Sequence, residues 1–191
     1  MKKIPTIFKR DPVERRYVLD EVNPSCQWVL DGEGVATRKY NGTCVARLED
    51  IGWVARREVK LGKTIPPGFV EQDMDKVTGK RFGYEPIQQS PFYKFWKEAI
   101  ENEEDFEYVL PLGTYELCGP KIQGNNEDLQ RHMLLSHEHA DHVGPLELTY
   151  EGLREAMIGL REFGYEGIVS HHPDGRMAKL KTRDFRLPPL D

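Results

Sequence analysis

A lysine directly before an Asn-Gly turn, Lys39, is the first of several residues whose types and order could carry out a chemical reaction. Two well-separated glutamates and a closing lysine pair follow it along the chain: Glu116, Glu166, Lys179 and Lys181. One nucleophile, two carboxylates and two cations suit an enzyme that transfers a nucleotide through a covalent lysine intermediate. We therefore expect Lys39 to be the catalytic nucleophile.

The chemistry explains why these residue types are needed. A lysine attacks the α-phosphorus of a nucleoside triphosphate as the neutral amine, and at a pKa near ~10.4 only about one lysine in a thousand is neutral at pH 7. A bound Mg²⁺ ion and neighbouring lysines disfavour the ammonium form. We expect Glu166 to hold the metal, directly or through water, because hard cations take oxygen ligands. Lys179 and Lys181 are expected to bind the α-phosphate and stabilise the transition state.

The order of these residues resembles the motifs of the covalent nucleotidyltransferase superfamily, which contains ligases and mRNA-capping enzymes. The nucleophile motif of that superfamily is Lys-x-Asp-Gly, and this chain has Asn41 where aspartate is usual. The asparagine removes a charge but keeps the turn. Tyr115-Glu116 matches the central strand motif, whose acid contacts the nucleotide ribose in the family.

Further motifs extend the resemblance over about residues 36–185. Glu166-Gly167-Ile168-Val169 matches the metal-binding strand motif, and Lys179-Leu180-Lys181 matches the closing lysine motif. Residues 119–125 are similar to a run found in RNA ligases of phages and of the eukaryotic 5′-to-3′ RNA ligase family. The resemblance implies that the following residues bind the nucleotide: Thr37, Arg38, Lys39, Arg56, Glu116, Lys179 and Lys181.

The resemblance implies an ATP-dependent RNA ligase that uses Mg²⁺ or Mn²⁺. Lys39 takes AMP from ATP, AMP passes to an RNA 5′-phosphate, and a 3′-hydroxyl then expels AMP and seals the strand. We expect one minimal nucleotidyltransferase domain over residues 1–191, with no separate C-terminal domain and with an accessory RNA-binding partner as an option. The alternatives within the superfamily are a DNA nick ligase and a capping-type guanylyltransferase.

A second metal signature supports a different class of enzyme. His137, His139, Asp141 and His142 reproduce the His-x-His-x-Asp-His pattern of metallo-β-lactamase-fold zinc hydrolases. Imidazole and carboxylate ligands at this spacing suit zinc. That fold needs further ligands over a long second half, which this chain does not offer. A polar loop, an incidental or regulatory metal site and a zinc hydrolase are therefore the three readings, in descending order.

Composition is typical of a soluble domain with one sizeable core, at 38% hydrophobic and 31% charged residues. The net charge of −5 excludes a uniformly basic nucleic-acid coat, although basic residues gather in three places along the chain. Three cysteines without paired or metal-ligand spacing suit a reducing compartment. We expect a cytoplasmic protein with no signal peptide and no membrane partner.

Local patterns predict a strand-rich α+β domain, with antiparallel sheets flanked by a few helices. Helices are expected from Ser90 to about Glu103 and from near Thr149 to the Phe163-Gly164 pair. Residues 66–68 and 72–83 are expected to form loops. Strands are expected over residues 27–30, 35–40, 44–48, 53–59, 108–112, 115–117 and 132–135, followed by a closing hairpin.

The closing hairpin turns at Pro173-Asp174-Gly175, and a two-residue Asp-Gly loop would fix its register. Glu166, Lys179 and Lys181 would then share one face of the hairpin, because side chains alternate along a strand. The cross-strand pairs predicted by this loop are His172 with Met177, Ser170 with Lys179, Ile168 with Lys181 and Glu166 with Arg183.

Overall fold

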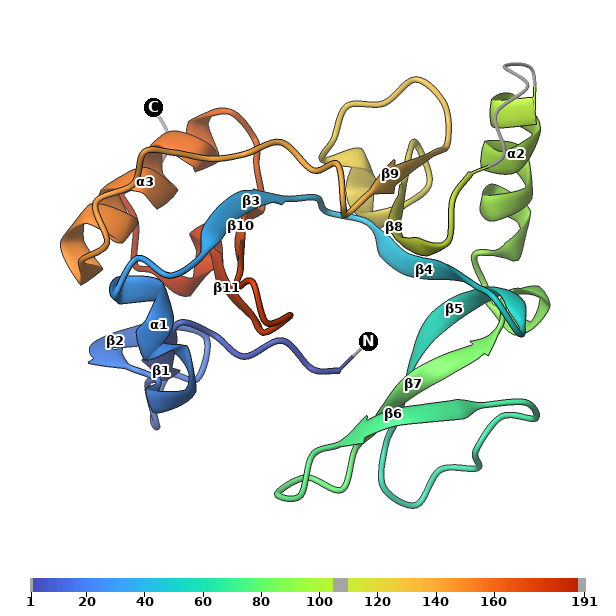
Figure 1. Ribbon diagram of the computed structural model, residues 1–191, viewed down its shortest axis with the longest axis horizontal. Coiled ribbons are helices and arrows are strands. Elements are labelled where there is room, and N and C mark those ends of the chain that lie inside the picture. The colour runs from blue at the N-terminus through green and yellow to red at the C-terminus, as the bar shows by residue number, and fades with distance from the viewer. Residues whose placement is uncertain (1, 105–109, 189–191) are drawn as a thin grey trace. The chain divides into compact units, whose positions relative to one another are not determined.

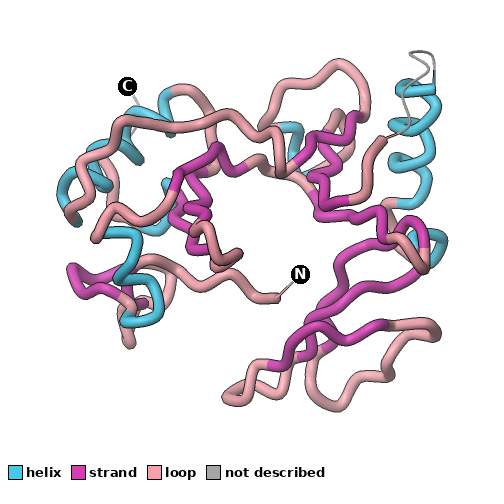
Figure 2. Tube along the Cα trace, viewed as in Figure 1, coloured by secondary structure: helices cyan, strands magenta, loops and turns pink. Residues whose placement is uncertain are grey.

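A computed structural model describes residues 2–104 and 110–188, and its fold is α+β, strand-rich and antiparallel. Contacts divide the chain into two compact units, each described here by itself (Figures 1 and 2). Unit 1 comprises residues 1–3 and 41–139, and unit 2 comprises residues 4–40 and 140–191. Lys39 therefore belongs to unit 2, whereas Glu116 and Arg56 belong to unit 1.

Unit 1 is built on a six-stranded antiparallel sheet with the strand order β6-β7-β5-β4-β8-β9. Its elements are β4 (Thr43–Leu48), β5 (Gly52–Val59), β6 (Val70–Met74), β7 (Arg81–Pro86), η2 (Ile87–Gln89), α2 (Tyr93–Glu104), β8 (Gly113–Cys118), η3 (Gln123–Asn125) and β9 (Met133–Ser136). One face of the sheet packs against aromatic residues from and just before α2. That core includes Val45, Ala55, Tyr115, Leu117, Phe92, Phe95 and Trp96.

The other face of this sheet carries the polar residues of interest. Val45 pairs with Tyr115 in the core, so their neighbours Cys44 and Glu116, which also pair, point to the opposite face. The same alternation along β5 places Arg56 there, paired with Tyr84. Two residues predicted to bind the nucleotide, Arg56 and Glu116, thus lie on one face of one sheet.

Unit 2 joins segments from both ends of the chain around a second core. Its elements are β1 (Phe8–Arg10), β2 (Val18–Val22), η1 (Pro24–Cys26), α1 (Gln27–Leu30), β3 (Val35–Lys39), α3 (Tyr150–Glu162), β10 (Gly167–His171), β11 (Met177–Lys181) and η4 (Thr182–Asp184). Leu153 and Met157 of α3 are buried in this core together with Ile168 and Leu180. Thr149 caps α3 by accepting a hydrogen bond from the Gly152 amide at 3.0 Å.

The three-stranded sheet of unit 2, ordered β11-β10-β3, has two different faces. Ile168, Ala178 and Leu180 point into the core beneath α3. The alternate residues therefore point to the opposite face, and they include Lys179 and Lys181. The outer edge of β11 is covered by the N-terminal segment, where the Ile7 amide donates to the Lys179 carbonyl at 3.0 Å.

Several predicted elements are confirmed, among them β3, the β4–β5 hairpin, β8, α2 and α3. The strand predicted over residues 27–30 is wrong, because Gln27–Leu30 forms the short helix α1. The loop predicted over residues 72–83 is wrong in part, since β6 and β7 form a hairpin there. Of the strand predicted over residues 108–112, the first two residues lie outside the described part of the chain, and residues 110–112 are a loop.

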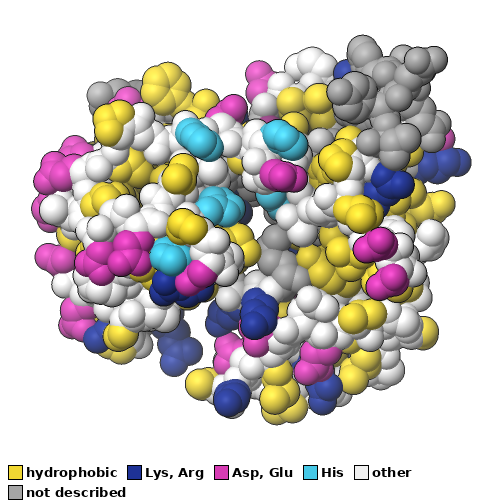
Figure 3. All heavy atoms as spheres, viewed as in Figure 1, with side chains coloured by type: hydrophobic (Ala, Val, Ile, Leu, Met, Phe, Trp, Pro, Cys, Tyr) yellow, Lys and Arg dark blue, Asp and Glu magenta, His cyan; other side chains and the backbone are white. Residues whose placement is uncertain are grey.

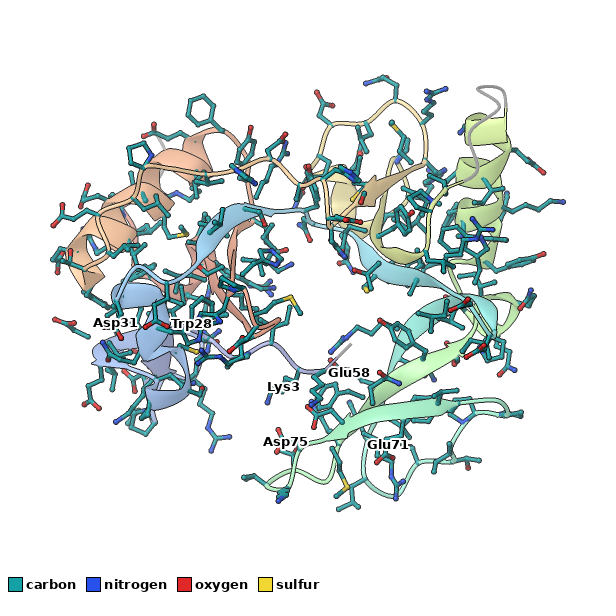
Figure 4. The ribbon with its side chains drawn as sticks, viewed as in Figure 1. Lys3, Trp28, Asp31, Glu58, Glu71 and Asp75 are labelled. Atoms are coloured by element: carbon teal, nitrogen blue, oxygen red, sulfur yellow. The ribbon has the colours of Figure 1, made fainter. Side chains whose placement is uncertain are left out.

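A turn stabilised by local hydrogen bonds closes the β6–β7 hairpin. The Asp75 side chain accepts hydrogen bonds from the Val77 and Thr78 amides and pairs with Lys3 at 2.9 Å (Figure 4). The Lys3 hydrogen bond, with those amides, lowers the pKa of Asp75 to about 2. The sequence signal for this turn was Asp75 followed by Gly79, whose φ of 65° favours glycine.

The predicted register of the closing hairpin is wrong by one residue. His172 pairs with Arg176 across a three-residue loop, Pro173-Asp174-Gly175, in which Gly175 has a φ of 90°. Lys179 therefore lies opposite Val169, and Lys181 lies opposite Gly167.

In the part of the chain that the structure describes, no helix is long and apolar enough to cross a membrane. Figure 3 shows acidic and basic side chains interspersed over the face in view.

Candidate functional site

A carboxylate held between two lysines is the most distinctive polar cluster of unit 2. Lys39 Nζ lies 2.5 Å from Glu166 Oε2, and Lys181 Nζ donates to the other carboxylate oxygen, Oε1. The exposed fractions of the side chains are 19% for Lys39, 14% for Lys181 and 11% for Glu166. Charged groups with so little exposure are costly to bury without a partner, and each of these side chains has an opposite charge in contact.

Register brings the two lysines to the same row of the sheet. Gly167 on the central strand β10 pairs with Lys39 of β3 on one side and with Lys181 of β11 on the other. Both lysines therefore project from the same face, with only a glycine between them. Glu166 immediately precedes this row and supplies the carboxylate.

Gly167 is required at the centre of the row because no side chain fits there. A Cβ atom at this position would lie 2.1 Å from the Leu180 carbonyl oxygen and 2.7 Å from the Lys181 Cα. Its φ of 150° is also a conformation that favours glycine. The glycine breaks the regular alternation just before β10, so Glu166 reaches Lys181 although the predicted pairing with Arg183 does not occur.

Burial and charge act in opposite directions on Glu166. Burial, the largest single influence, would raise its pKa, but the charges and hydrogen bonds of Lys39 and Lys181 together hold the pKa below its ordinary value. Glu166 is thus an ionised electrostatic partner at neutral pH and a poor proton acceptor. Burial lowers the pKa of Lys181, helped by the nearby charges of Lys39 and Arg183 and opposed by Glu166.

The remaining predicted residues of unit 2 lie on two faces. Thr37 shares the face of Lys39, where its hydroxyl donates to the Val169 carbonyl at 3.3 Å and lies 3.0 Å from His171 Nε2. Lys179 shares the face of Lys181 and is half-buried. Arg38 points the other way, and its guanidinium stacks 3.7 Å from the centre of the Tyr165 ring.

Glu116 in unit 1 is held from two directions. The Gly42 amide donates to its Oε1 at 3.1 Å, and His137 Nε2 lies 3.0 Å from its Oε2. Gly42 approaches so closely that a Cβ atom there would lie 2.3 Å from the Leu117 carbonyl oxygen. Close packing against β8, rather than a left-handed backbone, is therefore the reason for a glycine at position 42.

Arg56 sits over the aromatic side chains of β7. Its guanidinium lies 5.4 Å from the centre of the Phe82 ring and 3.2 Å from Glu58 Oε1. Burial raises the pKa of Tyr84, and the nearby Cys44 adds to this rise while Arg56 opposes it. The arginine is therefore close enough to influence the Tyr84 hydroxyl.

The residues of the zinc signature are divided between the two units. His137 binds Thr114 and Glu116, and His139 Nδ1 lies 3.2 Å from Ser136 Oγ. Asp141 and His142 belong to unit 2. In residues 2–104 and 110–188, no three His, Cys, Asp or Glu side chains could hold a metal ion together.

The residues around Glu166 fit a magnesium ion that takes only one ligand from the protein. Mg²⁺ keeps several waters and often takes one or two carboxylates together with substrate phosphates, rather than a cage made entirely by the protein. A single carboxylate beside lysines suits an ion that arrives with a nucleotide. Glu166 is the residue that would hold it.

The contacts of two residues were not predicted from the sequence: the close packing of Gly167 against β11 and the hydrogen bonds of His137. The sequence pattern places Gly167 in the metal-binding strand motif and predicts a polar loop or a metal ligand at His137. The signal for Gly167 was a glycine directly beside a predicted ligand, where a strand would otherwise favour a larger residue.

No protein-family model matches the chain, and a search of curated proteins finds no matching sequence.

Proposed function

We propose that this protein is an ATP-dependent RNA ligase that forms a covalent lysyl-AMP intermediate on Lys39. The observation that carries the proposal is the contact of Lys39 and Lys181 with the two oxygens of Glu166. A purely structural ion pair needs one cation for each anion. Here two lysines contact one carboxylate, so positive charge exceeds negative charge among these three residues.

The excess positive charge suits a triphosphate. A phosphate chain brings the negative charge that the cluster lacks, and it can compete with Glu166 for the two ammonium groups. Mg²⁺ would supply charge neutralisation of the phosphates and is expected to draw on Glu166 as its protein ligand. Lys181 and Lys179 are left to bind and orient the α-phosphate.

The first step of the proposed reaction involves these bond changes. The Lys39 ammonium loses a proton, and the amine nitrogen forms a bond to the α-phosphorus while the bond to the pyrophosphate oxygen breaks. Glu166 has a lowered pKa, so it does not keep that proton at neutral pH. Its part is electrostatic, and the proton leaves to solvent.

The choice of ATP and RNA comes from the sequence resemblance. The motif around residues 119–125 favours RNA ligases over DNA ligases and capping enzymes. On the same basis we propose that Glu116 contacts the ribose and that Arg56 binds the nucleotide. Joining of RNA then requires transfer of AMP to a 5′-phosphate and attack by a 3′-hydroxyl.

Labelling with radioactive nucleotides tests the proposal. The parent protein is incubated with Mg²⁺ and either α-labelled ATP or α-labelled GTP, and the denatured protein is separated on a gel. We expect covalent labelling by ATP that is lost in Lys39→Ala and Lys39→Arg and kept in Lys9→Arg, a lysine on the surface of unit 2. Undiminished labelling of the Lys39 variants would refute the proposal, and labelling by GTP alone would favour the capping alternative.

Strand joining tests the second half of the proposal. The parent is given RNA or DNA strands with a 5′-phosphate and a 3′-hydroxyl, with and without a complementary splint. We expect joined RNA in the presence of ATP, and joining of pre-adenylated RNA without ATP. Joining of nicked DNA but not RNA would favour the DNA ligase alternative.

A further inference from the structure

We infer that His137 is a positioning residue for Glu116, which fixes the carboxylate for recognition of the ribose hydroxyls of the nucleotide. The inference rests on the proposed function and assigns a role to a histidine that this function leaves unused. It also replaces the metal-binding interpretation of this residue with a hydrogen-bonding one.

The three residues involved lie together on one face of the unit 1 sheet. Thr114 and Glu116 are two positions apart on β8, so their side chains point to the same face. His137 follows β9 and continues its register, because its amide donates to the Thr114 carbonyl at 3.1 Å. Its side chain therefore lies beside Thr114 and diagonal to Glu116.

The imidazole ring connects the two side chains. Nδ1 lies 2.9 Å from Thr114 Oγ1, and Nε2 lies 3.0 Å from Glu116 Oε2. An ionised carboxylate only accepts hydrogen bonds, so Nε2 must carry a proton and donate. In the neutral ring Nδ1 then accepts from the threonine hydroxyl. The chain of donors runs from Thr114 through His137 to Glu116.

This arrangement holds Glu116 in place and leaves acceptor positions on its carboxylate for a ligand. A carboxylate can accept about four hydrogen bonds, and two come from Gly42 and His137. One bond on each oxygen fixes the plane of the group, and the remaining acceptor positions suit hydroxyl donors such as those of a ribose. The Glu116 side chain is 11% exposed and that of His137 is 24% exposed, so water competes weakly for these bonds.

A group held in advance binds its ligand with a smaller loss of entropy than a mobile one. Loss of the His137 hydrogen bond should therefore weaken nucleotide binding and reduce the preference for ribonucleotides over deoxyribonucleotides. It should affect the maximal rate of bond formation less, because that step depends on Lys39 and its neighbours in unit 2. A merely structural histidine would not produce this selective pattern.

The test compares self-labelling by ATP, 2′-deoxy-ATP and 3′-deoxy-ATP in the parent and in a set of variants. For each protein the half-saturating nucleotide concentration and the maximal labelling rate are measured. We expect His137→Ala to raise the half-saturating ATP concentration about tenfold, on the scale of a hydrogen bond to a charged group. Its preference for ATP over the deoxy analogues should shrink, with the maximal rate within about threefold of the parent.

Matched variants separate positioning from folding. His137→Gln keeps a donor close to the place of Nε2 and should restore most of the ribose preference. Thr114→Val removes only the hydroxyl that bonds to the far side of the imidazole ring, and it should reduce the ribose preference by an intermediate amount. His139→Ala, two residues along the same loop, should behave as the parent. Circular dichroism of each variant confirms that it is folded.

The outcomes distinguish this inference from the proposed function. If the parent labels and Glu116→Gln loses ribose preference while folded His137→Ala and Thr114→Val keep it, His137 does not position the carboxylate and only this inference fails. If His137→Gln is as impaired as His137→Ala, the donor role is overturned. If the parent takes no label from ATP, the proposed function fails and the inference fails with it.

Discussion

Replacement of Glu166 by glutamine removes the charge that holds Lys39 and Lys181 together, and it should destabilise the protein. Breaking a buried ion pair from one side costs ~3–5 kcal/mol. The two lysine side chains keep 19% and 14% exposure, so water relieves part of the repulsion that remains. We therefore expect a loss of ~2–4 kcal/mol, reduced from that range for partial exposure. At about 2–4 °C per kcal/mol, the melting temperature should fall by roughly 5–15 °C.

The effect should depend on pH in a direction set by the pKa of Glu166. That pKa lies below its ordinary value of 4.5, so the carboxylate stabilises the fold above this value and loses its contribution as the pH falls through the folded pKa. The deficit of Glu166→Gln should be complete at about pH 7 and should shrink at about pH 3.5.

Urea unfolding followed by circular dichroism at both pH values measures this difference. Glu162→Gln is the control, because it makes the same chemical change at an exposed position of α3. An unchanged unfolding midpoint of Glu166→Gln at neutral pH would refute the electrostatic reasoning. An equal deficit at both pH values would assign the effect to shape rather than charge.

Two further comparisons test the three-stranded sheet of unit 2 and the close approach of Gly42 to β8. Lys181→Ala should slow formation of the Lys39 adduct by a factor of order 10² while keeping the fold, whereas Leu180→Ala should cost ~2–5 kcal/mol of stability because its side chain is fully buried. Burst labelling and the melting temperatures of both variants test these expectations. A Lys181→Ala variant that melts early but labels normally would show that the lysine has only a structural role. Gly42→Ala should cost roughly 1–3 kcal/mol, since its Cβ would meet Leu117 and Glu116. Gly159→Ala on α3 is the control, where a Cβ meets nothing within 4 Å, and equal stability of the two variants would contradict the close approach.

Much of the fold around the site could be predicted from local pattern. Alternation and turn residues located β3 and the β4–β5 hairpin, and the Thr149 cap with a terminal Gly164 located α3. The order of the motifs also indicated that Lys39, Glu166 and Lys181 act together, and the structure places them in contact. These signals are local in sequence or are carried by residue type alone.

The errors arise where short segments depend on their neighbours. Gln27–Leu30 has apolar residues suited to a strand, but Asn23 caps the turn before it and Pro24 begins that turn, so a helix follows. The predicted register of the closing hairpin is wrong by one residue because an Asp-Gly pair fits both a two-residue and a three-residue loop. The link between His137 and Glu116 could not be predicted, since it depends on the register of two strands.

The construction of unit 2 from both ends of the chain has a consequence for biosynthesis. Lys39 and Glu166 are 127 positions apart, and β3 leaves the ribosome long before β10 and β11 exist. Such distant pairings form late, because the chain must first close a long loop. During translation Lys39 therefore precedes its ion-pair partner Glu166, and a chain that stops before β10 lacks the three-stranded sheet that brings the two residues together. The charged cluster of unit 2 can therefore assemble only after β11 has been synthesised.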